Sequence, residues 1–144
     1  MKRFKRILSL VLCVAALTAG AGSVSAGAAA PEIVRVGLTV SGQSAFASPM
    51  LENASGAGYT FGTMNGTTFS GSTKVPNTQL TIKLVNDAFQ VQDTGTGAVL
   101  YTTAAGADHL AIHPAGELTW FKGYKWRGDF VYRRASGGDI TVIN

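Results

Sequence analysis

Cysteine is almost absent from this chain of 144 residues. Its one cysteine, Cys13, lies in an apolar run near the start, so the rest of the chain has to fold without a disulfide. Charged residues are also scarce, at 14%. After residue 26 the chain has eight basic residues (12 − 4) and eight acidic ones, so it is neutral overall. This balance excludes the strong positive field that nucleic-acid binding needs, and we expect no nucleic-acid partner.

The first 26 residues have the pattern of a signal peptide. Four cations within residues 2–6 precede the apolar run 7–20, and Val24 and Ala26 stand at the positions of a cleavage site. The strongly apolar part is shorter than the ~20 residues that a membrane span needs. We therefore expect cleavage after Ala26 and a bacterial protein that is secreted or associated with the cell wall. The alternative is an uncleaved segment that anchors the chain in the membrane.

Alternating apolar and polar residues beyond position 26 predict short β-strands. Such runs lie at 32–40, 79–87 and 109–114. Asn65-Gly66 and the segment 93–97 are turn signals between strand-like runs, and each predicts a hairpin. Residues 41–58 read as a loop, residues 104–108 as a small linker, and no stretch has a convincing helical period. We therefore expect a mostly β fold of small antiparallel strands and hairpins.

The sequence Asp93-Thr94-Gly95 matches the signature of aspartic proteases. Those enzymes need two such aspartates, which share one proton to activate water. The signature also has two apolar residues before the aspartate, where this chain has Val91 and Gln92. We expect a turn instead, in which Asp93 bonds its own backbone and Gly95 takes a positive φ.

His109 and His113 are four residues apart, the spacing of a metal-binding pair on a helix. The alternation of Leu110 and Ile112 favours a strand, on which the two histidines share a face with Ala111. The zinc-protease motif has a glutamate between its two histidines, and this chain has none there. We expect neither a metal site nor a cofactor.

The stretch 118–134 is rich in aromatic residues and cations. In one continuous strand, Trp126 would share a face with Phe130 and Tyr132, and Arg127 would lie on the other face. The aromatic residues can form the core of a small β-domain. Alternatively, exposed rings stack on sugars while the cations meet the carboxylates of peptidoglycan. For that second interpretation the candidate glycan-binding residues are Trp120, Tyr124, Trp126 and Arg127.

The segment "LAIHPAGELTWFKGYKWRGDFVYRRASGGDITVIN" resembles the beginning of the SpoIID/amidase-enhancer domain, the stage II sporulation protein D family. The matching pieces are Gly123, Trp126 in place of the usual tyrosine, Arg127, Gly128 and the final "ITVIN". "IVRVGLTV" is similar to the opening strand of such proteins. The resemblance divides the chain into a signal peptide (1–26), an N-terminal β region (27–105) and the incomplete start of a SpoIID-like domain (106–144).

The resemblance implies a role in peptidoglycan remodelling, as a lytic transglycosylase or an amidase enhancer. In the family, the strand ending in Val/Ile-Asn precedes the segment that carries the catalytic glutamate. The resemblance therefore implies a chain that stops before its catalytic residue, is inactive alone, and leaves the far edge of its last strand unpaired. The partners would be glycan strands and a cell-wall amidase. The alternative is a complete non-enzymatic β-domain that binds cell-wall glycan or a partner amidase.

Overall fold

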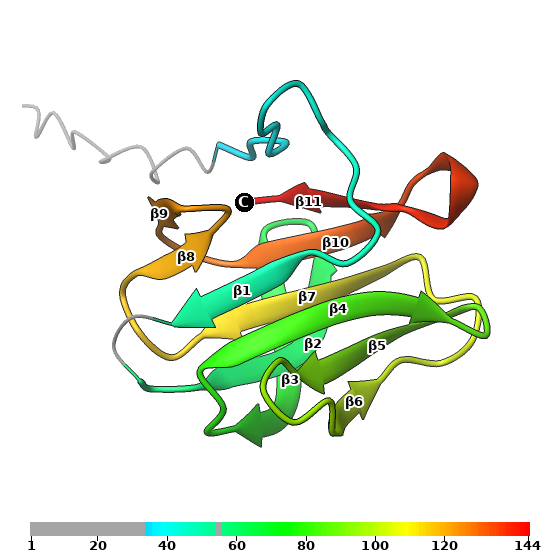
Figure 1. Ribbon diagram of the computed structural model, residues 1–144. Coiled ribbons are helices and arrows are strands. Elements are labelled where there is room, and N and C mark those ends of the chain that lie inside the picture. Colours follow the sequence, from blue (N-terminus) through cyan, green and yellow to red (C-terminus); the bar gives the residue numbers. More distant parts are fainter. Residues whose placement is uncertain (1–33, 54–55) are drawn as a thin grey trace, which may run out of the picture. The chain divides into compact units, whose positions relative to one another are not determined.

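A computed structural model describes residues 34–53 and 56–144, which belong to one compact unit, Ile33–Asn144. The signal peptide expected at 1–26 lies outside the described residues. The strands, labelled in Figure 1, are β1 (Met50–Asn53), β2 (Tyr59–Asn65), β3 (Thr68–Val75), β4 (Gln79–Val85), β5 (Ala88–Asp93), β6 (Val99–Thr102), β7 (His109–Pro114), β8 (Thr119–Phe121), β9 (Tyr124–Trp126), β10 (Phe130–Arg134) and β11 (Ile140–Ile143).

The strands form two antiparallel sheets. One sheet has the order β6-β5-β4-β1-β8-β9 and the other the order β11-β10-β7-β2-β3. In Figure 1, β1 and β4 of the six-stranded sheet pass in front of β7 and β2 of the five-stranded sheet. Within the described residues the only helical element is a short 3-10 turn at Ser136–Gly138. The predicted mostly β fold of antiparallel strands is confirmed.

The core lies between the two sheets because each strand turns alternate apolar residues inward. The inner face of the six-stranded sheet contributes Leu51, Leu80, Ile82, Phe89, Val91 and Phe121. The five-stranded sheet contributes Tyr59, Phe61, Leu110, Ile112, Phe130, Tyr132, Ile140 and Val142. All of these side chains are buried, and the rings of Phe61 and Tyr101 meet across the core with centroids 5.2 Å apart.

The expected boundary between residues 105 and 106 does not separate two units in this structure. Strands β8 and β9 follow it in sequence but pair in the sheet that contains β4, β5 and β6. Strands β7, β10 and β11 also follow it, and they pair with β2 and β3. Both sheets therefore need strands from both sides of the boundary.

Three local expectations are wrong. Described residues of the run 32–40 make only isolated bridges, and Val34 and Val36 are exposed while Leu38 is buried. Strand β1 lies inside the segment 41–58 that reads as a loop, because a pattern of only four residues is too short to stand out. The stretch 118–134 is not one continuous strand. A turn at Lys122-Gly123, where both φ angles are positive, separates β8 from β9, and the chain then crosses to the other sheet.

The far edge of β11 was expected to be unpaired, and this expectation is also wrong. The segment 36–46 runs along that edge. The amides of Val36 and Leu38 donate to the carbonyls of Asn144 (2.7 Å) and Val142 (2.8 Å), and Phe46 exchanges two bonds with Ile140 (2.9 Å each). Leu38 and Phe46 are buried, and the Phe46 ring meets Phe121 edge-on at 5.4 Å. The segment thus covers β11 and also joins the core.

The predicted hairpin at Asn65-Gly66 is confirmed as β2–β3, and it bends at a pair of glycines. The register shifts between Phe61 and Gly62. A Cβ atom on Gly62 would collide with the carbonyl of Ser70, and one on Gly71 with that of Phe61, so only glycine permits the two backbones to approach this closely. Beyond the bend, the amide of Met64 donates to His109 Nε2 (2.9 Å). The hairpin tip is therefore held against the outer face of β7.

We predict that the cover of β11 depends on Leu38. Truncation by Leu38→Ala removes a buried side chain and should cost about 2–5 kcal/mol of unfolding free energy. Native-state hydrogen exchange should become faster at Ile140 and Asn144, whose amides donate to the covering segment. Thr141 and Ile143 should change less, because alternation turns their amides toward β10.

The control for this prediction is Val36→Ala. Val36 lies on the same segment and is 46% exposed, against 2% for Leu38, so its truncation should leave exchange at β11 nearly unchanged. Equal effects of the two variants would mean that the segment is held by its backbone bonds alone.

Candidate functional site

The Asp93 segment forms the turn of the predicted β5–β6 hairpin. Asp93 Oδ1 accepts hydrogen bonds from the amide and the hydroxyl of Thr96, both at 2.8 Å, and Oδ2 accepts one from Asn77 Nδ2, also at 2.8 Å. The expected self-bonded turn is confirmed, but the positive φ falls at Gly97 (72°) and not at Gly95. The Asp93 carboxylate therefore stabilises the turn in which it lies, and this structural role accounts for the protease-like motif.

The hydrogen bonds hold the Asp93 carboxyl in its charged form. Its pKa is lowered, first by the Thr96 side chain and then by Asn77 and the Thr96 amide. A lowered folded-state pKa means that the carboxylate stabilises the fold at pH values above the unfolded-state pKa. This contribution is lost as the pH falls through the folded-state pKa.

The two histidines lie on the outer face of β7, as the alternation predicts, but they have separate partners. His109 accepts the Met64 amide at Nε2, and its Nδ1 lies 3.2 Å from Asp108 Oδ2. His113 Nδ1 lies 2.6 Å from Asp129 Oδ1, and its ring packs on Phe69 with centroids 5.4 Å apart. Within the described residues no group of three or more histidine, cysteine or acidic side chains comes together to hold a metal ion.

The structure does not bring the four candidate glycan-binding residues together. The β8–β9 register pairs Trp120 with Lys125 and Thr119 with Trp126, so Trp120 and Trp126 point to opposite faces. Trp126 packs against the core, and Tyr124, on the same side, is 61% exposed at the turn. Arg127 follows β9 and forms an exposed ion pair with Glu117 at 2.5 Å. Of the four, only Trp120 lies on the outer face of the six-stranded sheet.

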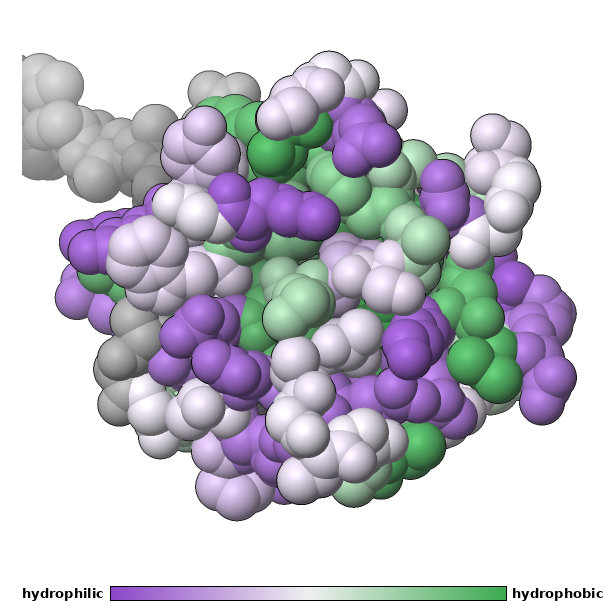
Figure 2. All heavy atoms as spheres, in the orientation of Figure 1, coloured by the Kyte–Doolittle hydropathy of each residue, from purple (hydrophilic) through white to green (hydrophobic). Residues whose placement is uncertain are grey.

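Trp120 belongs to a row of outward side chains that crosses four strands. Strand register places Lys125 beside Trp120, Trp120 beside Glu52, and Glu52 beside Gln79. A parallel row contains Met50, Thr81 and Gln92. With strands about 4.8 Å apart, four strands span about 14 Å, the scale of a short oligosaccharide. Figure 2 shows many hydrophilic residues on the side of the molecule seen in Figure 1, interrupted by small hydrophobic areas.

A groove of about 270 Å³ lies in this face, and we call it the Trp120 groove. It is lined by Met50, Leu51, Glu52, Gln79, Trp120, Lys122 and Gly123. The sequence indicated Trp120 but not Met50 or Glu52, which lie in the segment 41–58. Gln79 begins a predicted strand, but only the register of β4 against β1 shows that it faces the groove.

Two lysines border the Trp120 groove. Lys125 Nζ lies over the Trp120 ring, 4.8 Å from its centroid, and Lys122 Nζ lies 5.2 Å from the centroid of Phe46. Such cation–π contacts at exposed sites contribute about 0.5–1 kcal/mol. Lys125 thus places a positive charge on the Trp120 indole, and Glu52 is the neighbour of Trp120 in strand register. Lys122 adds a second cation to the lining of the groove. The groove can therefore combine stacking on a ring with charged and amide hydrogen bonds.

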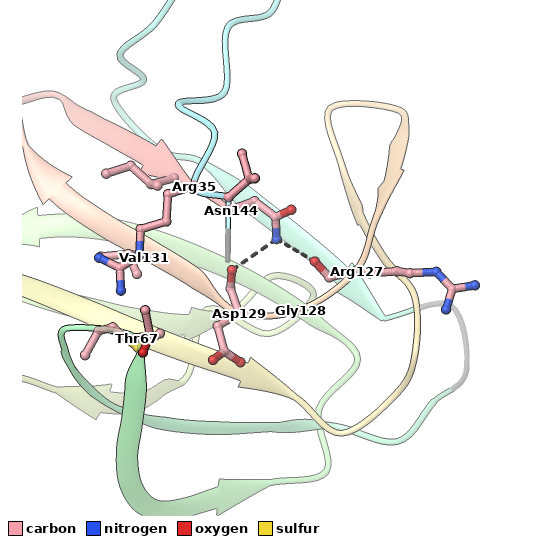
Figure 3. A pocket seen from close by; sticks show the side chains of 10 residues that line it. Arg35, Thr67, Arg127, Gly128, Asp129, Val131 and Asn144 are labelled. Carbon is pink, nitrogen blue, oxygen red and sulfur yellow. Dashed lines mark hydrogen bonds between the residues drawn. The ribbon is translucent and has the colours of Figure 1, made fainter. Parts of the chain in front are cut away.

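A second hollow, of about 280 Å³, lies on the outer face of the five-stranded sheet, and we call it the Arg35 pocket. Its lining includes Arg35, Thr67 and Asp129 as polar residues and Met64, Val131 and Ile143 as apolar ones. Figure 3 shows Arg35 and Asp129 on two sides of Thr67, and it shows the Arg127 side chain directed away. Nothing in the sequence pattern connects these positions, which come from four separate segments.

Comparisons with family models, with curated proteins and with solved structures gave no match. No helix among the described residues is both long and apolar enough to cross a bilayer.

We predict that Asp93→Asn lowers the unfolding midpoint at neutral pH, because the neutral amide is a weaker acceptor for Thr96 and Asn77. The difference between wild type and variant should shrink as the pH falls below about 4, the unfolded-state range of an aspartate. Thermal unfolding curves recorded by circular dichroism over a pH series measure this difference in midpoint. Asp139→Asn is the control for loss of one negative charge. A difference that stays constant down to low pH would contradict the role given to the Asp93 charge.

Proposed function

We propose that residues 34–144 form a non-catalytic binding module for cell-wall glycan, and that the Trp120 groove is its binding site. The observation that carries the proposal is the outward row of Lys125, Trp120, Glu52 and Gln79 beside a groove on one sheet face. The leader pattern of residues 1–26 supports the proposal, because it directs the protein to the compartment where such glycans occur.

The chemistry of the Trp120 groove suits an amino sugar polymer. An indole face packs on the apolar C–H face of a sugar ring, and the exposed side chain of Met50 extends this apolar surface. Gln79 and Glu52 offer an amide and a carboxylate to hydroxyl and acetamido groups. Lys122 and Lys125 can pair with the carboxylates of peptidoglycan, which neutral glycans lack. A small number of polar groups on an apolar wall is typical of ligand sites.

The peptidoglycan-remodelling role implied by the SpoIID resemblance fits the same ligand. A lytic transglycosylase needs a carboxylic acid beside the scissile bond, and the acidic residue that lines the Trp120 groove is Glu52. Glu52 is exposed and has no second carboxylate beside it among the groove residues. The arrangement supports binding better than cleavage. Recruitment of a partner amidase to the bound glycan remains compatible with this module.

Binding to a soluble glycan tests the Trp120 groove. The protein should bind a tetramer of β-1,4-linked N-acetylglucosamine in isothermal titration calorimetry, and Trp120→Ala should weaken binding about tenfold, equivalent to about 1.4 kcal/mol. Tyr124→Ala is the matched control, because Tyr124 is an exposed aromatic residue on the same hairpin outside the groove. Equal losses in the two variants, or no binding by wild type, would refute the proposed site.

We expect the protein to bind peptidoglycan without cleaving it. Incubation with purified peptidoglycan should release no soluble anhydro-muropeptides, as measured by liquid chromatography and mass spectrometry. The bound fraction in a pull-down should fall when Lys122 and Lys125 are both replaced by Gln, since the wall carboxylates lose their partners. Release of muropeptides that Glu52→Gln abolishes would instead make the groove an active site.

A further inference from the structure

We propose that the Arg35 pocket binds a small zwitterion of the peptide class, with its carboxylate on Arg35 and its ammonium on Asp129. The proposal does not rest on the glycan site, because the pocket lies on the other sheet. Arg35 and Asp129 carry opposite signs and flank an apolar floor of Val131 and Ile143. This charge pattern complements a molecule with one charge at each end and a short apolar body between them.

Both charged groups are held in place by bonds that leave capacity for a ligand. The Arg35 guanidinium donates to the carbonyl of Gly66 through Nη2, and a guanidinium has five donors. Among the described residues, the hydrogen-bond partner of the Asp129 carboxylate is His113 on Oδ1, which leaves Oδ2 for a ligand. Because these side chains are already held in place, they lose less conformational entropy when a ligand binds.

The backbone beneath the pocket is fixed as well. Asn144 Nδ2 donates to the carbonyls of Arg127 (2.9 Å) and Asp129 (3.0 Å), which are the two dashed bonds in Figure 3. Gly128, between them, has a φ of 82°, a conformation that side-chain-bearing residues rarely adopt. The side chain of Arg127 points outward to Glu117 and so leaves Arg35 as the cation of the pocket.

The size of the pocket limits the ligand. Drug-sized molecules occupy pockets of about 300–1,000 Å³, and this pocket, at about 280 Å³, falls just below that range. The apolar floor favours short aliphatic side chains over charged ones. A dipeptide such as alanyl-alanine has the required two charges and a small body. The class of ligand is therefore a short peptide with two free ends.

The test uses the full chain and the dipeptide alanyl-alanine, in its L,L and D,D forms, in a titration followed by nuclear magnetic resonance. We expect at least one form to bind saturably with a Kd of about 1 mM or tighter. N-acetylation or C-amidation of that peptide should each weaken binding about tenfold, because each cap removes one charge. These capped peptides test the proposal without changing the protein.

Protein variants then assign each charge to its partner. Arg35→Gln should weaken binding of the free peptide about tenfold and leave binding of the amidated peptide unchanged. Asp129→Asn should also weaken binding of the free peptide about tenfold, and it should leave binding of the acetylated peptide unchanged. Arg133→Gln, an exposed cation on β10 outside the pocket, is the control and should change nothing. Absence of saturable binding, or binding that is insensitive to both caps, would overturn the proposal.

Discussion

Burial of the inner faces of the two sheets is the constraint on which the rest of this structure depends. With no cysteine after residue 13, the fold is held by packing between the sheets and by backbone pairing. Because side chains alternate along a strand, each buried residue fixes an outward neighbour. Burial of Thr119 and Phe121 thus directs Trp120 to the outer surface. A shift of one residue in β8 would bury Trp120 and remove it from its groove.

The outer faces acquire their hollows at places where the chain departs from regular pairing. On the six-stranded sheet, the Lys122-Gly123 turn follows Trp120 and contributes both of its residues to the lining of the groove. On the five-stranded sheet, the Gly62–Gly71 approach bends the β2–β3 hairpin over β7, and the Arg35 pocket forms between its tip and β10. The segment 36–46 completes this arrangement by covering β11. A glycine with a positive φ lines each hollow, Gly123 in the Trp120 groove and Gly128 in the Arg35 pocket.

Much of the fold follows from local sequence patterns. Period-two alternation predicted β4 and β7, and turn residues predicted the β2–β3 and β5–β6 hairpins, because these signals arise within a few neighbouring residues. The pairing of β1 with β4 and β8, and the bonds of Val36 and Leu38 to β11, are contacts between distant segments. Periodicity carries no information about such pairings. The expectation of a continuous strand at 118–134 was wrong because Lys122 takes a positive φ, and in the sequence only the adjacent glycine indicates this turn.

The candidate site was harder to predict than the fold. Aromatic richness singled out Trp120, Tyr124 and Trp126, but composition cannot say which ring faces inward until the register is known. Register assigned Trp126 to the core and Trp120 to the surface. It also gave Trp120 the neighbours Glu52 and Gln79, which are 68 and 41 residues away in sequence (120 − 52 and 120 − 79). A binding surface that spans several strands is therefore a property of pairing.

The most direct test of glycan binding on the six-stranded sheet is residue-level mapping by nuclear magnetic resonance. Isotope-labelled protein would be titrated with the N-acetylglucosamine tetramer while backbone amide and indole resonances are recorded. The proposed site predicts shifts at the Trp120 indole and at amides of β1, β4 and β8, with little change in β7 and β10. Shifts confined to the five-stranded sheet, or no shifts at saturating ligand, would contradict glycan binding at the Trp120 groove.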